Sequence, residues 1–72
     1  MKVKIVIVGS TGKLGTKLLN YTHQNSIPIY CITCYQNYKK LNAQKNKFRV
    51  NKAYVTSKSN DEKNFFKILE KN

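Results

Sequence analysis

The sequence predicts an α/β fold in which parallel strands alternate with helices, and three observations lead to this class. Apolar, β-branched stretches recur at residues 3–8, 27–34 and 53–56, as expected for strands. Each is followed by a stretch whose apolar residues repeat at helical spacing. Residues 9–15, between the first strand and the first helix, contain all three glycines of the 72-residue chain. The order β-α-β-α-β-α implies a parallel sheet with right-handed crossovers.

The first strand and helix are predicted from residues 3–24. The stretch VKIVIV (3–8) is almost wholly apolar, which is typical of a strand buried on both faces of a parallel sheet. Helical spacing begins near residue 11 and continues to residue 24, and Asn25 and Ser26 end it. The apolar face expected to pack on the sheet consists of Leu14, Leu18, Leu19 and Tyr21 or Thr22.

The remaining elements are shorter or less apolar. Residues 27–34, with Pro28 near their start, predict a second strand, and residues 37–48 a second helix capped by Asn37. A short third strand is expected at 53–56, followed by a third helix capped by Ser59 or Asn60. Its first turn is acidic, which suits the helix dipole. The apolar side chains expected to hold these two helices are Tyr38, Leu41, the stem of Lys45 and Phe48 in the second, and Phe65, Phe66, Ile68 and Leu69 in the third.

The net charge of +11, from 14 basic and 3 acidic residues, is compatible with nucleic acid, a membrane surface or anionic small molecules as partners. The basic residues are mostly lysines, spread along the chain together with many Asn, Ile and Tyr. This mixture favours compositional drift in an A/T-rich genome over a nucleic-acid footprint. No stretch approaches the ~20 apolar residues that span a bilayer. The N-terminal apolar run is too short for a secretory signal, so a cytoplasmic location is expected.

The two cysteines, Cys31 and Cys34, form a C-x-x-C pair, a spacing found in zinc and redox sites. His23 is the single histidine, so no second pair of ligands exists. Residues three apart on a strand point to opposite faces of the sheet. We therefore predict two buried small hydrophobic side chains and no metal site.

The glycine loop suggests a chemical role. Gly9 and Gly12 lack Cβ atoms, so the backbone could turn tightly there and an anion could approach, and Gly15 would let the first helix pack closely against the strand. Backbone N–H groups at a helix start bind phosphates. The G-x-x-G-x-x-G spacing after a strand therefore predicts a pyrophosphate cradle in an NAD(P)-binding, Rossmann-like three-layer αβα half-fold. A P-loop is excluded because Leu14, and not Ser or Thr, follows Lys13.

The end of the second strand indicates which dinucleotide is preferred. NAD binders usually place an acidic residue there to hold the ribose 2′-hydroxyl, but the stretch TCYQNYKK contains none. It offers Asn37 at a helix start, followed by Lys39 and Lys40. These groups suit a 2′-phosphate, which favours NADP over NAD.

Through the stretch IVIVGSTGKLGT and the residues after its second strand, the chain resembles the 1-deoxy-D-xylulose 5-phosphate reductoisomerase family. Members of this family are NADPH-dependent enzymes of the non-mevalonate route of isoprenoid biosynthesis. The family's loop typically reads Gly-Ser-Thr-Gly-Ser-Ile-Gly, and Gly-Lys-Asn or a close variant follows its second strand. The resemblance implies cofactor contacts from Gly9, Ser10, Thr11, Gly12, Lys13, Leu14, Gly15, Tyr35, Gln36 and Asn37. Lys13, Tyr35 and Gln36 depart from the pattern, so Lys39 or Lys40 would have to supply the cation for the 2′-phosphate.

The resemblance covers essentially the whole chain but only the beginning of the family's longer one. It implies that residues 1–72 are the N-terminal part of an NAD(P)-binding domain, truncated and inactive alone, without the catalytic and C-terminal domains. The full enzyme would isomerise and reduce 1-deoxy-D-xylulose 5-phosphate to 2-C-methyl-D-erythritol 4-phosphate with NADPH and a divalent metal (Mg or Mn). No catalytic or metal-binding residue falls within residues 1–72. The resemblance further implies that the full-length enzyme forms a homodimer and has no membrane partner. It also implies a location in the cytoplasm or in a plastid-type stroma.

Two alternatives remain open. One is another NAD(P)-binding Rossmann protein, such as a short-chain-type reductase or a redox sensor. Tyr35 and Lys39 have the Y-x-x-x-K spacing of that group, but they lie after the second strand, which is the wrong place for that role. The other is a basic module that binds nucleic acid through Tyr35, Tyr38, Lys39 and Lys40. Binding of such a module would weaken steeply with salt.

Overall fold

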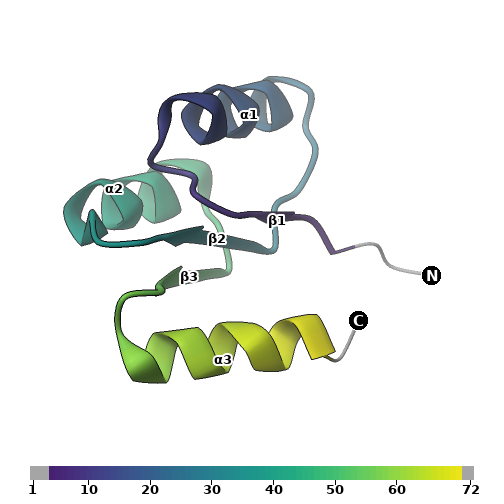
Figure 1. The fold of residues 1–72 in the computed structure, drawn as a ribbon. Coiled ribbons are helices and arrows are strands. Elements are labelled where there is room, and N and C mark those ends of the chain that lie inside the picture. The colour runs from purple at the N-terminus through teal and green to yellow at the C-terminus, as the bar shows by residue number, and fades with distance from the viewer. Residues whose placement is uncertain (1–3, 71–72) are drawn as a thin grey trace.

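The computed structural model describes residues 4–70, and its elements follow the predicted order (Figure 1). They are β1 (Val6–Ile7), α1 (Lys13–Gln24), β2 (Cys31–Cys34), α2 (Tyr38–Phe48), β3 (Lys52–Val55) and α3 (Ser59–Glu70). The predicted alternation of strands and helices is confirmed. Within residues 4–70, no helix is both long and apolar enough to cross a membrane.

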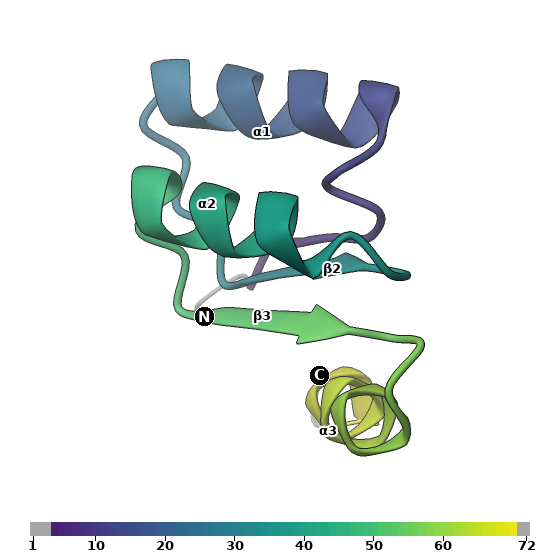
Figure 2. The same ribbon diagram turned by 90° about the vertical axis from the view of Figure 1, so that its left-hand side faces the viewer.

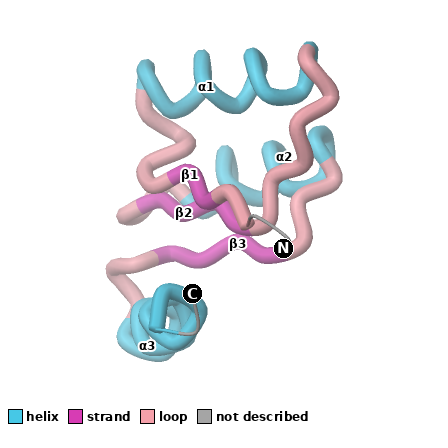
Figure 3. Tube along the Cα trace, turned by 90° about the vertical axis from the view of Figure 1, so that its right-hand side faces the viewer, coloured by secondary structure: helices cyan, strands magenta, loops and turns pink. Residues whose placement is uncertain are grey.

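The three strands form one parallel sheet in the order β1-β2-β3. Val6 is aligned with Cys31, and Cys31 in turn with Lys52. Helices α1 and α2 lie on one face and α3 on the other (Figures 2 and 3). Two successive right-handed crossovers that step in the same direction place their helices on the same face. The predicted three-layer αβα arrangement is therefore confirmed.

The first two strands are shorter than predicted, and the third is shifted by one residue. Residue 3 lies outside the described residues, Lys4 and Ile5 are not paired as a strand, and Val8 is exposed in a turn. The first strand is therefore not buried on both faces. In the second stretch only Cys31–Cys34 is strand, although the Tyr30 N–H just before it donates to the Ile5 oxygen at 2.9 Å. The third strand begins one residue earlier and ends one residue earlier than expected.

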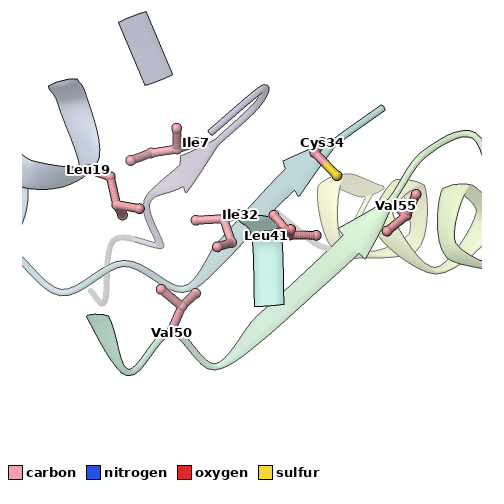
Figure 4. Close-up of a cluster of buried hydrophobic side chains, with 7 residues drawn as sticks. All are labelled: Ile7, Leu19, Ile32, Cys34, Leu41, Val50 and Val55. Atoms are coloured by element: carbon pink, nitrogen blue, oxygen red, sulfur yellow. The ribbon is translucent and has the colours of Figure 1, made fainter. Parts of the chain in front are cut away.

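The core lies between the sheet and the helices α1 and α2 (Figure 4). It consists of Ile7, Leu19, Ile32, Cys34, Leu41, Val50 and Val55, with Ile29, Phe48 and Ala53 packed against it. Ile32 and Cys34 are two residues apart on β2 and so share a face. Cys31 is fully buried but lies outside this cluster. This confirms that the two cysteines are buried and agrees with their placement on opposite faces.

The face of α1 that packs on the sheet agrees with the predicted one at Leu19 and differs from it at the other apolar residues. Leu14, Leu18 and Tyr21 are 70%, 45% and 59% exposed, whereas Gly15 and Leu19 are buried. The buried face is rotated by one residue, about 100° around the helix. Gly15 determines which face of α1 is buried. The helix lies closest to the preceding loop at this residue, because it has no side chain.

The other two helices bury fewer of their apolar residues than expected. In α2, Leu41 is buried together with Gln44, while Tyr38 is half exposed. In α3 only Phe65 is fully buried, and Phe66 and Leu69 are about half exposed. Their outward faces have no further layer of residues 4–70 to pack against.

The start of α3 also differs from the prediction. Ser59 and Asn60 are both inside the helix, so neither is its cap. The acidic first turn is confirmed, and Asp61 there accepts a hydrogen bond from the Val55 N–H at 2.9 Å. This contact attaches the helix start to the end of β3, which the capping prediction did not foresee.

Candidate functional site

The glycine loop needs two of its three glycines for conformation or packing. Gly9 has φ +74°, in the left-handed region that favours glycine. A Cβ atom on Gly15 would overlap the Gly9 carbonyl oxygen and lie 2.7 Å from the Ser10 Cα. A Cβ on Gly12 would meet only the Gly9 oxygen, at 3.4 Å. A small side chain would therefore fit at position 12, and packing does not explain why this residue is glycine.

The backbone N–H groups of the loop fall into two sets. The Ser10 N–H donates to the Thr33 oxygen at 2.9 Å, and the Gly12 N–H donates to the Gly9 oxygen at 3.1 Å. The N–H groups of Thr11, Lys13, Leu14 and Gly15 donate to no acceptor within residues 4–70. Those of Lys13, Leu14 and Gly15 are the unsatisfied donors of the first turn of α1, where the helix dipole is positive, and Thr11 lies just before the N-cap Gly12. They provide the donors that an anion would need.

A buried polar network lies beneath the loop. The Ser10 hydroxyl donates to Gln44 Oε1 at 2.8 Å, and Gln44 Nε2 donates to the Ser10 carbonyl oxygen at 2.9 Å. Thr16 donates to the same oxygen at 3.1 Å, and the Gly9 N–H donates to Thr33 Oγ1 at 3.3 Å. Every buried side-chain N or O atom in the described residues has a hydrogen-bond partner. Ser10 itself is fully buried, so its side chain faces the protein interior.

Gln44, Thr33 and Thr16 belong to this network but are not among the site residues predicted from the sequence. For Gln44 a signal was available, because it lies three residues after Leu41 and so shares the buried side of α2. A glutamine at such a position must find partners in the interior. Nothing in the sequence alone indicated that those partners would be in the glycine loop.

The second predicted part of the site follows β2. Tyr35, Gln36 and Asn37 are all exposed. Asn37 Oδ1 accepts the Lys40 N–H at 3.3 Å, which confirms Asn37 as the N-cap of α2. The Lys40 Nζ donates to the Thr11 oxygen at 2.9 Å. The two parts of the predicted site therefore lie together at the carboxyl edge of the sheet.

Positive charge predominates around this edge, although Asp61 also lies at it, bonded to the Val55 N–H at the end of β3. All three acidic residues of the chain, Asp61, Glu62 and Glu70, belong to α3 on the opposite face of the sheet. Lys13, Lys39 and Lys40 are exposed near the loop and the start of α2. The helix starts and these lysines together make the edge attractive to anions.

The two cysteines are buried, uncharged thiols. Burial raises the pKa of Cys31 to about 11, with nearby Lys52 acting in the opposite direction. Burial also raises the pKa of Cys34, against a backbone hydrogen bond from Asn37. Both thiols are thus protonated at neutral pH, and both are free. Within residues 4–70, no group of three or more His, Cys, Asp or Glu side chains could hold a metal ion.

Two hollows in the structure lie away from the glycine loop. One, of about 320 Å³, is lined by residues at the ends of α1 and α2, including His23, Ser26 and Arg49. The other, of about 470 Å³, lies between the sheet and α3 and includes Lys4 and Lys52. Neither includes a residue of the loop or of 35–37.

Comparison with known proteins points to one family. The family model for 1-deoxy-D-xylulose 5-phosphate reductoisomerase matches residues 5–71. A curated protein of Campylobacter hominis, named 1-deoxy-D-xylulose 5-phosphate reductoisomerase, is 37% identical over 51 residues. Those residues are 71% of this chain but 14% of the relative, so the chain spans a small part of that protein's length. No solved structure matches the chain.

Proposed function

The chain belongs to the 1-deoxy-D-xylulose 5-phosphate reductoisomerase family, and we propose that it forms the part of such an enzyme that binds NADPH. The observation that carries the proposal is the set of unpaired N–H groups, on Thr11, Lys13, Leu14 and Gly15, around the start of α1. In this proposal they hold the pyrophosphate. Gly12 leaves the approach open because it has no side chain.

The residues around the loop are suited to a phosphorylated dinucleotide. Asn37 uses its side-chain oxygen as a cap, so its amide nitrogen remains able to donate to a ribose or a 2′-phosphate. Lys39 and Lys40 supply the cations that Gln36 does not. Lys40 already reaches the loop through its bond to the Thr11 oxygen. The bound cofactor would supply the hydride, while these residues bind and orient it.

The full-length enzyme is proposed to convert 1-deoxy-D-xylulose 5-phosphate to 2-C-methyl-D-erythritol 4-phosphate in isoprenoid biosynthesis. Its phosphosugar substrate and its divalent metal would be held by parts of the enzyme outside residues 1–72. A homodimer in the cytoplasm, or in a plastid-type stroma, completes the proposal. The chain by itself is expected to bind cofactor without turnover.

The proposal is tested by titrating the chain with NADPH and following cofactor fluorescence. We expect saturable binding, stronger for NADPH than for NADH. A parallel titration with duplex and single-stranded DNA over a salt series should show only weak, steeply salt-dependent binding. DNA binding that exceeds NADPH binding at physiological salt would refute the proposal.

The sharpest variant is Gly12→Asp. Aspartate is a preferred N-cap, so α1 should keep its stability, but its carboxylate would lie where the pyrophosphate binds. Repulsion between two like charges about 4 Å apart costs about 1 kcal/mol in bulk water and about 4 kcal/mol near a protein surface. We therefore expect the Kd for NADPH to rise about tenfold or more.

The matched control is Asn42→Asp, which makes the same charge change at an exposed position of α2. It should leave the Kd nearly unchanged. Equal effects of the two variants would show that only overall charge matters, and would remove the loop from the proposal.

A further inference from the structure

Gln44 is the one side chain of α2 that holds the glycine loop by two hydrogen bonds. Its Oε1 accepts the Ser10 hydroxyl at 2.8 Å, and its Nε2 donates to the Ser10 carbonyl oxygen at 2.9 Å. Both residues are buried, Ser10 completely and Gln44 to 6% exposure. The contact joins positions 34 residues apart in the sequence. It is therefore a tertiary contact between α2 and the loop.

The position of Ser10 controls the direction of the residues after it. Its N–H is bound to the Thr33 oxygen of β2, its carbonyl oxygen accepts from Gln44 and Thr16, and its hydroxyl donates to Gln44. All polar groups of Ser10 are thus directed inward. The next N–H, on Thr11, is the first of those that have no acceptor within residues 4–70.

From this geometry we propose that Gln44 is a positioning residue for the candidate cofactor site. It holds Ser10 against α2 and β2, and this orients the N–H groups of Thr11, Lys13 and Leu14 toward the anion. The inference rests on the proposed function and adds a residue that makes no contact with the cofactor. It also couples the loop to α2, the helix whose start carries Asn37 and Lys40.

The chemistry of the contact requires a primary amide. One side chain must accept from a hydroxyl and donate to a carbonyl oxygen, and the planar amide of Gln does both. An ionised Glu would place a second oxygen against the Ser10 carbonyl. Leucine would leave the hydroxyl and the carbonyl of Ser10 short of a partner in the interior.

The test uses Gln44→Leu, Ser10→Ala, the double variant and the control Asn42→Leu, each in the whole chain. Asn42 lies on the exposed side of α2. Loss of two buried hydrogen bonds should raise the Kd for NADPH about tenfold in Gln44→Leu. Ser10→Ala should raise it severalfold, although the Ser10 side chain is buried away from the cofactor. The double variant should bind no more weakly than Gln44→Leu alone.

A second readout separates positioning from general loss of stability. In ¹⁵N–¹H spectra without cofactor, the signals of Thr11, Lys13 and Leu14 should shift in Gln44→Leu, while those of α3 should not. If Gln44→Leu does not fold, Ser10→Ala, which removes a single hydroxyl oxygen, carries the same prediction. Unshifted loop signals in a folded variant, or an additive double variant, would overturn the inference.

Failure of the inference is distinguishable from failure of the proposed function. If the unmodified chain does not bind NADPH, the proposed function fails, and the loop signals alone decide whether Gln44 positions the loop. If the unmodified chain binds NADPH and Gln44→Leu binds equally well, the role of Gln44 is refuted and the proposed function stands.

Discussion

The sheet face covered by α1 and α2 differs from the face covered by α3 in what it buries. Between the sheet and the first two helices lie seven buried apolar side chains and the polar network around Ser10 and Gln44. Helix α3 is held by one buried ring, Phe65, whose centroid lies 6.5 Å from that of Tyr54, and by the Asp61 contact to Val55.

The two faces should therefore differ in whether a substitution changes cofactor binding as well as stability. The α1 and α2 face carries the core and also directs the glycine loop, so disturbing it should affect folding and cofactor binding together. The α3 face carries no residue of the candidate site. Changes there should reduce stability while the folded molecules keep their affinity for NADPH.

The largest effect is expected from Leu19→Ala, on the first face. Leu19 is fully buried in the core, and Leu→Ala at such sites costs about 2–5 kcal/mol. For a chain of this size that is a large part of the total stability. Urea unfolding would measure the loss, and NADPH titration should show weaker binding. The neighbouring Leu18→Ala, at a half-exposed position, should cost far less; a reversed order would contradict the observed orientation of α1.

On the second face, Phe65→Ala should cost about 3 kcal/mol. Because Phe65 lies on α3, away from the loop, the Kd for NADPH of the folded molecules should stay unchanged. Phe66→Ala, at a half-exposed position one residue on, is the control and should cost less than about 1 kcal/mol. Loss of NADPH affinity in a fully folded Phe65→Ala protein would show that the two faces are coupled.

A smaller effect is expected from Asp61→Ala, which removes the acceptor of the Val55 N–H. A hydrogen bond to a charged group contributes about 1.5–3 kcal/mol at most, and partial exposure places this one at the lower end. Glu62→Ala makes the same charge change one residue away, where no such bond exists, and should cost little. If chemical unfolding shows the same loss of unfolding free energy in both variants, the charge at the helix start is responsible, and not the hydrogen bond.

The smallest effect concerns pH and Cys31. Because burial raises its pKa to about 11, the folded state keeps its proton while the unfolded thiol ionises near pH 9. The unfolded state then binds fewer protons, so stability falls as pH rises. Between pH 9 and pH 10 the loss should be about 1 kcal/mol relative to Cys31→Ala. Chemical unfolding of both proteins over this pH range gives the free energy of unfolding at each pH. If this free energy falls equally with pH in the two proteins, Cys31 does not have a raised pKa.

Much of the first face could be predicted from sequence, and its polar contacts could not. The strand–helix alternation, the tight turn of the glycine loop, the close packing at Gly15 and the Asn37 cap follow from local chemistry. The buried side of α1 does not, since the stripes through Leu14 and Leu19 have the same spacing. Which one packs inward depends on where Gly15 meets the loop. The Ser10–Gln44 pair depends on the register of two helices that local patterns do not specify.

The placement of the acidic residues affects how the protein meets its ligands in solution. Helix α3 combines three carboxylates with two lysines, while the other residues carry twelve basic side chains and no acidic one. A diffusing polyanion is therefore attracted toward the loop side before any contact forms. Its association rate should rise as ionic strength falls, because the Debye length grows from about 8 Å in physiological salt to about 30 Å at 0.01 M.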